Sequence, residues 1–122
     1  MGSVDARPLT PVERATLLRL TEPTWFDGAA EYRRQIDHAM VVGRCECGCP
    51  TIDLAIDRSV APRSPRPGTP LLPVEGVLGE GEDHLQLICF ALDGWLETLE
   101  LVFVASPPPA EFPDPRAWQL IT

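Results

Sequence analysis

Three cysteines stand two residues apart in the segment Cys45-Glu-Cys-Gly-Cys-Pro50. Thiolates are soft ligands that suit Zn²⁺ and Cu(I), so Cys45, Cys47 and Cys49 are candidate ligands of such a metal. The spacing departs from that of zinc ribbons and knuckles, in which two residues separate the paired cysteines. A tetrahedral zinc site would also need a fourth ligand from elsewhere in the chain. The candidates for it are Cys89, His38 and His84.

The cysteine segment has two other interpretations. The thiols could form a reversible disulfide and sense redox state, or they could be small, apolar-like side chains that fill a hairpin. The total of four cysteines permits disulfides, but three of them within five residues do not have the spacing of a disulfide framework. The start of the chain resembles no secretory leader, so we expect a cytoplasmic location and free thiols.

A catalytic centre has little support in the sequence. A nucleophilic cysteine needs a base within hydrogen-bond reach, and neither His38 nor His84 stands in a recognisable motif. Asp53 and Asp57 share one face of an expected strand, where exposure to solvent explains them better than acid–base chemistry does. The pattern therefore favours a protein without catalytic activity, although it leaves an enzyme open.

The charge of the chain narrows the classes of partner. Eighteen acidic residues and ten basic ones, all of them arginine, give a formal net charge of −8. Such a charge repels nucleic acids and anionic membranes, but it attracts a basic protein. The composition favours a soluble, non-enzymatic protein-binding or regulatory domain, for example an immunity-type inhibitor of a basic toxin. A zinc-binding or redox-sensing role for the cysteines is the alternative, and the oligomeric state stays open.

Two helices are predicted ahead of the cysteines. Thr10-Pro-Val-Glu13 is typical of a capping box, which would start a helix over 11–21. Apolar residues at helical spacing predict a second helix over 29–39. Because the pattern changes to that of strands from residue 40 onward, we expect an α+β fold. Two N-terminal helices would pack on one face of a four- to five-stranded antiparallel sheet.

Five segments have the alternating or continuously apolar pattern of strands. They are 40–46, 51–57, 74–78, 84–92 and 95–104. The cysteine segment would join the first two as a hairpin, and Asp93-Gly94 is the typical turn of another hairpin. The whole chain, 1–122, would form a single domain. Its remaining parts would be a flexible arm over 1–9, a Pro/Arg-rich loop over 58–73 and an extended Pro-rich tail over 105–122.

Three segments together resemble a known family. They are Arg7-Pro-Leu-Thr-Pro-Val-Glu-Arg14, the run Val41-Val-Gly-Arg-Cys-Glu-Cys-Gly-Cys-Pro-Thr-Ile-Asp-Leu54, and Asp93-Gly-Trp-Leu-Glu-Thr-Leu-Glu100. Pro73-Val-Glu75 and Pro113-Asp-Pro115 extend the likeness. The chain is similar in these segments to a family of small actinobacterial proteins, a domain of unknown function. The resemblance implies one α+β domain from about residue 7 onward, and it carries over no catalytic residue.

Overall fold

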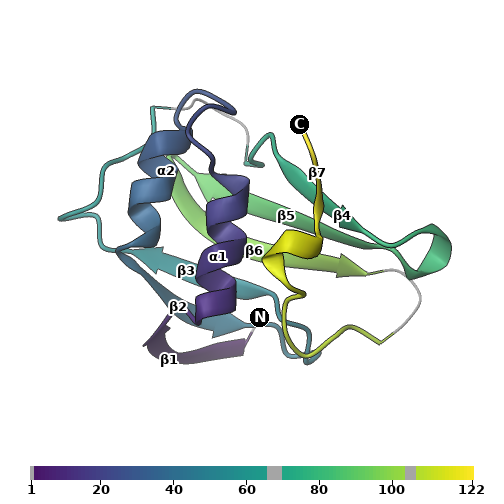
Figure 1. The fold of residues 1–122 in the computed structure, drawn as a ribbon. Helices are drawn as coiled ribbons and strands as arrows, with labels where there is room; N and C mark the ends of the chain where they lie inside the picture. The colour runs from purple at the N-terminus through teal and green to yellow at the C-terminus, as the bar shows by residue number, and fades with distance from the viewer. Residues whose placement is uncertain (1, 66–69, 104–106) are drawn as a thin grey trace.

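Segments from both ends of the chain take part in one sheet. The computed structural model describes residues 2–65, 70–103 and 107–122, and within them seven strands pair antiparallel in the order β1-β2-β3-β6-β5-β4-β7 (Figure 1). The strands are β1 (Gly2–Pro8), β2 (Ala39–Arg44), β3 (Ile52–Ile56), β4 (Glu75–Leu78), β5 (Leu85–Leu92), β6 (Trp95–Phe103) and β7 (Gln119–Ile121). The helical elements are α1 (Pro11–Leu20), α2 (Ala29–Ile36) and the 3-10 turns η1 (Gly81–Asp83) and η2 (Pro115–Ala117).

The α+β class is confirmed, whereas the expected four to five strands are too few. The additional strands lie at the two edges of the sheet and come from the expected arm over 1–9 and tail over 105–122. β1 pairs with β2, and β7 pairs with β4. β1 alternates only over the short run Ser3-Val-Asp-Ala-Arg7, and β7 has three residues, so neither has a strong strand pattern of its own. The expected flexible arm thus contains β1, and the expected extended tail contains β7.

The long loop between β3 and β4 is only partly described. Residues 66–69 of the expected loop over 58–73 lie outside the described residues, as do 105 and 106 of the tail. Leu71 forms an isolated bridge with Phe90 of β5, and Leu72 donates its N–H to the carbonyl of Cys89 at 2.9 Å. The last part of this loop thus lies against β5.

Both helices begin where the sequence predicts and end earlier. The capping box is present: Glu13 donates its N–H to Thr10 Oγ1 at 3.1 Å, and the Glu13 carboxylate accepts from the Thr10 N–H at 2.9 Å. α1 ends at Leu20 instead of residue 21, and α2 ends at Ile36 instead of residue 39 because Ala39 already begins β2. Neither described helix is long and apolar enough to cross a membrane.

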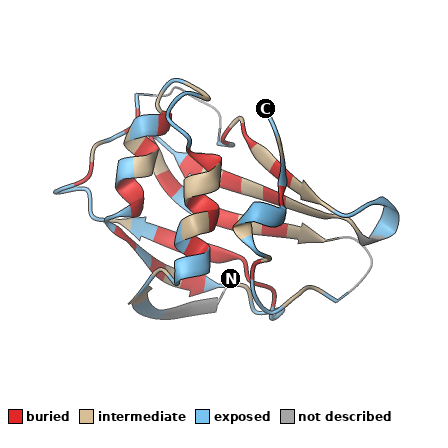
Figure 2. Ribbon diagram, in the orientation of Figure 1, coloured by how far each residue is buried: buried red, intermediate tan, exposed pale blue. Residues whose placement is uncertain are grey.

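The hydrophobic core joins helical and strand residues in one cluster. In Figure 1 the two helices lie in front of the sheet, and Figure 2 shows buried positions on both. The fully buried side chains include Leu17, Leu20, Tyr32, Val41, Ile52 and Leu99. Gln35 attaches α2 to β6, because its amide nitrogen donates to Gly94 O at 2.8 Å and its oxygen accepts from the Leu96 N–H at 2.9 Å.

Candidate metal centre

The three clustered cysteines lie in the connection between β2 and β3, which we call the cysteine loop (residues 45–51). The predicted hairpin is present, since β2 and β3 pair antiparallel on either side of this loop. The loop is closed by a hydrogen bond from the Cys45 N–H to Thr51 O at 3.1 Å. Thr51 Oγ1 in turn accepts from the Leu101 N–H of β6 at 3.0 Å. Both ends of the loop are therefore fixed to the sheet.

A glycine turn folds the loop back on itself. The Gly48 N–H donates to Cys45 O at 3.4 Å, and Gly48 has a φ of +92°. Glycine adopts this left-handed conformation readily because it has no Cβ. The turn brings the backbone of Cys49 against the side chain of Cys47, whose sulfur accepts from the Cys49 N–H at 3.4 Å. Cysteines that are separated by a single residue can thus bring their sulfurs together when a glycine provides the turn.

The three sulfur atoms form one compact group. All Sγ atoms of Cys45, Cys47 and Cys49 lie within 4.8 Å of one another, and those of Cys45 and Cys47 are 3.0 Å apart. Zn–S bonds of about 2.3 Å in a tetrahedron place two sulfurs roughly 3.8 Å apart, so the group has nearly the dimensions of three zinc ligands. Cys49 is buried, Cys45 is half-buried and Cys47 is exposed. The group is therefore open to solvent on the Cys47 side.

The sulfurs differ in how readily they lose a proton. Burial raises the pKa of the Cys49 thiol, but hydrogen bonds from Cys47, Thr51 and Cys45 lower it by more, so this pKa lies below its usual value. The hydrogen bond to Cys45, followed by that to Cys49, raises the pKa of Cys47 to about 11. Of these two thiols, Cys49 thus loses its proton at the lower pH, and Cys47 keeps its proton until a metal or a base displaces it.

None of the three expected fourth ligands joins this group. Cys89 is in β5, is 1% exposed, and burial raises the pKa of its thiol to about 12. His38 precedes β2 at the other end of the hairpin, and six residues of strand at about 3.3 Å each separate it from the cysteine loop by roughly 20 Å. The ring Nδ1 of His84 lies 2.6 Å from Gly81 O in the connection between β4 and β5. Among described residues, the metal-sized group contains the loop cysteines alone.

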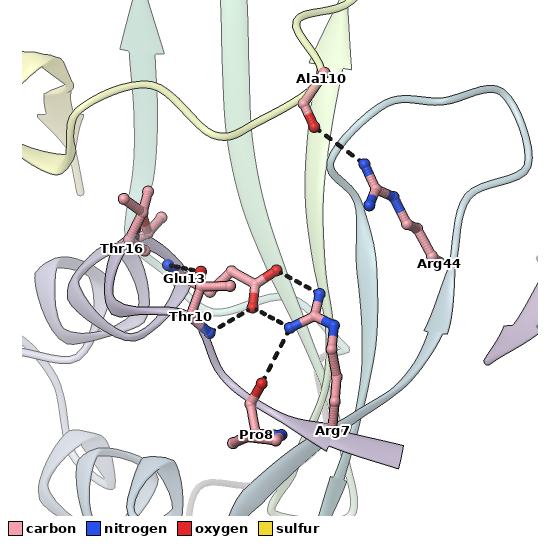
Figure 3. Close-up of polar contacts among 8 residues, drawn as sticks. Arg7, Pro8, Thr10, Glu13, Thr16, Arg44 and Ala110 are labelled. Atoms are coloured by element: carbon pink, nitrogen blue, oxygen red, sulfur yellow. Dashed lines mark hydrogen bonds and ion pairs between the residues drawn. The ribbon is translucent and has the colours of Figure 1, made fainter. Parts of the chain in front are cut away.

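A pocket lies beside the loop and was not expected from the sequence. Its volume is about 350 Å³, and its lining includes Arg7, Glu13, Arg44 and Pro50. Figure 3 shows the first three of these side chains. Arg7 belongs to the segment expected to be a flexible arm, so the sequence did not predict its ion pair with Glu13 in the first turn of α1. The capping box was the one signal at this place, and it was interpreted as the start of a helix only.

Comparisons with known proteins provide no relative from which a role could be transferred. No protein-family model, no curated protein and no solved structure matches this chain. The resemblance to the actinobacterial family therefore stays a prediction, and the function has to be argued from the chemistry of the site.

Proposed function

We propose that this protein binds one soft metal ion, Zn²⁺, through the thiolates of Cys45, Cys47 and Cys49. The observation that supports the proposal is the convergence of three sulfurs within 4.8 Å at a surface loop. Thiolate is the ligand type that selects Zn²⁺ and Cu(I) over the more abundant hard cations. The zinc-binding alternative that the sequence left open thus becomes the function that the geometry supports best.

The convergence is hard to explain by packing. A cysteine that fills space in a core is buried among apolar side chains, as Cys89 is, whereas Cys47 is exposed and Cys45 is half-buried. A disulfide also explains only part of the arrangement, because it would use two sulfurs and leave the third without a role. A metal ion is the one partner that would use all three sulfurs at once.

The chain would contribute three ligands, and the fourth coordination position would be left for water or another ligand. Closed structural zinc sites have four protein ligands, while sites with three protein ligands keep one position for water or another ligand. The exposed Cys47 side is where this position would lie. Since hydrogen bonds to the sheet already fix both ends of the loop, the fold does not depend on the metal for its shape. These features favour a site that takes up and releases a metal ion over one that holds the fold together.

Proton loss controls the affinity of such a site. Metal ligands must be thiolates, and the Cys47 thiol, with a pKa of about 11, is protonated at neutral pH. Binding of Zn²⁺ therefore displaces its proton, and the apparent affinity increases as the pH rises toward 11. Cys49, whose pKa is lowered, provides the first anionic contact for the incoming ion.

The test is a zinc titration of the reduced protein followed by native mass spectrometry, with affinity measured against a chromophoric chelator. We expect one Zn²⁺ per chain and an affinity that falls by about tenfold or more in Cys47→Ser. Cys89→Ala is the matched control, because it removes a thiol outside the loop, and it should bind zinc as the unchanged protein does. Less than about a tenth of an equivalent of bound zinc, or equal losses in both variants, would contradict the proposal.

The metal content of protein purified without a chelator identifies the metal. Cu(I) binds thiolates more tightly than Zn²⁺ at zinc sites as well, so displacement alone would not decide, but copper in place of zinc in the purified protein would make the assignment of zinc wrong. The expectation of a basic protein partner depends on the net charge of −8 alone, and it stays a prediction.

A further inference from the structure

The pocket beside the cysteine loop has the size of a small-molecule site. Its volume of about 350 Å³ lies within the usual range for such sites, and its lining contains both apolar and charged groups. Four parts of the chain meet there: β1, the first turn of α1, the ends of the cysteine loop, and the tail segment 110–112. The described lining includes no cysteine, so an argument about this pocket does not depend on the metal proposal.

One side of the pocket is a rigid ion pair. Arg7 donates two parallel hydrogen bonds to the Glu13 carboxylate, at 2.9 and 3.0 Å, as Figure 3 shows. Burial raises the pKa of Glu13, but the bonds from Arg7 and from the Thr10 N–H lower it by more, so Glu13 stays ionised. The charges of Arg7 and Glu13 therefore match each other, and neither is available to neutralise a ligand.

Arg44 is different, because its guanidinium forms no ion pair among the residues that the structure describes. It projects from the end of β2, and its one hydrogen bond there is from Nη2 to the neutral carbonyl of Ala110 at 3.1 Å (Figure 3). A guanidinium has five N–H donors, so most of them are left for an occupant of the pocket. The Thr10 hydroxyl is not a further donor, because its oxygen accepts from the Glu13 N–H and its side chain also hydrogen-bonds to the Glu13 carboxylate.

We propose that this pocket binds a small organic monocarboxylate, with its carboxylate on Arg44 and its apolar part against Val12 and Phe112. The planar fork of a guanidinium matches the two oxygens of a carboxylate. Arg44 forms no ion pair among the described residues, so its fork can take a single carboxylate. Glu111 also lines the pocket and brings the formal charge of the lining to zero, so a ligand with a second negative charge is repelled, as it is by the net charge of the chain.

The test is an NMR titration of ¹⁵N-labelled protein with phenylacetate, in parallel with phenylacetamide, which has nearly the same shape and no charge. We expect saturable shifts of the Val12, Arg44 and Phe112 amide signals with phenylacetate, and binding of phenylacetamide that is weaker by about tenfold or more. Equal binding of the two compounds would overturn the carboxylate assignment. The absence of saturable shifts up to about 10 mM phenylacetate, which is weak even for a fragment, would overturn the site.

Substitutions of Arg44 and of a distant arginine separate the role of Arg44 from the effect of the overall charge of the chain. Arg44→Gln should weaken phenylacetate binding by about tenfold or more. Arg44→Lys keeps the charge but loses the fork, so its affinity should lie between those of Arg44→Gln and the unchanged protein. The matched control is Arg34→Gln on the exposed side of α2, which should leave binding unchanged. If Arg44→Gln binds as tightly as the unchanged protein, or if Arg34→Gln loses as much, the assignment of Arg44 is wrong. An otherwise unchanged spectrum shows that each variant is folded.

Discussion

Two regions of the molecule use the same side chain in opposite ways: the cysteine loop and the interior strand β5. Cys49 of the loop and Cys89 of β5 are both hidden from solvent, with 2% and 1% of their surface exposed. The pKa of Cys49 nevertheless lies below its usual value, whereas burial raises that of Cys89 to about 12. Loss of contact with water therefore does not by itself decide the chemistry of a thiol.

Hydrogen-bond donors make the difference between these two sites. Around Cys89 the core is apolar, and its thiol makes only a long contact of 3.8 Å to Phe90 O, in which the sulfur is the donor. A thiolate there would have no donor to stabilise it. Cys49 lies in a surface loop where the thiols of Cys45 and Cys47 and the Thr51 hydroxyl can all donate to its sulfur. The loop can thus hold a negative sulfur, and the strand cannot.

Native alkylation should show the largest difference between the two regions. We expect iodoacetamide at pH 9 to label Cys47 about a hundredfold faster than Cys89 in the reduced, metal-free protein. At this pH roughly one Cys47 in a hundred is a thiolate, because its pKa is about 11. Cys89 reacts only in unfolded molecules. With a free energy of unfolding of about 5 kcal/mol, roughly one molecule in 5,000 is unfolded.

The rates would be read from peptide masses as a function of time. Labelling in denaturant is the control, because both thiols should then react at similar rates. Labelling of native Cys89 as fast as Cys47 would mean that β5 opens easily, and the contrast between loop and strand would fail.

The contrast could be predicted in part from the sequence. Cys89 stands in the run 88–92, which is apolar on both faces as is typical of an interior strand, and β5 is interior. The hairpin around the cysteine loop followed from alternation on either side of a glycine turn. These features are local, since each depends on the residues within a few positions of it.

The position of Cys89 relative to the cysteine loop depends on contacts between distant parts of the chain. β5 is separated from β3 by β6, a strand order that alternation within single strands does not encode. For this reason Cys89 could not be removed from the set of fourth ligands, whereas the place of His38 at the far end of the hairpin follows from the length of β2 alone. The pocket could not be foreseen either, because it requires Arg7 of β1 and the tail around Ala110 to meet beside α1. Neither segment has a pattern that shows which other part of the chain it contacts.

Stability should show the next largest effect. We expect Cys89→Ser to lower the free energy of unfolding by about 1–3 kcal/mol, because it places a hydroxyl in an apolar core in place of a thiol. Cys47→Ser should change it by no more than about 0.5 kcal/mol, since this side chain is exposed. Urea denaturation of both variants under reducing conditions gives the two values. Similar losses in both would indicate that the loop contributes to the core, against the separation argued above.

The smallest expected effect concerns the cysteine loop alone. It is the change in the pKa of Cys47 when the thiol of Cys45 is removed. The hydrogen bond to Cys45 is the largest cause of the raised pKa of Cys47, so Cys45→Ala should lower that pKa from about 11 toward the usual thiol range. A fall of about one unit gives roughly ten times more thiolate at a fixed pH below both values. The less basic thiolate is also a weaker nucleophile by roughly a factor of three, which reduces the tenfold gain. Labelling of Cys47 should therefore accelerate about threefold.

The measurement is the rate of Cys47 alkylation between about pH 8 and pH 11.5, with Cys89→Ala as the control that leaves the midpoint unchanged. A midpoint that stays near 11 in Cys45→Ala would show that the contact with Cys45 does not raise the pKa of Cys47. The argument that hydrogen bonds among the loop thiols set their acidity would then be weakened. A lowered midpoint would instead place the difference between loop and strand in the hydrogen bonds among three thiols.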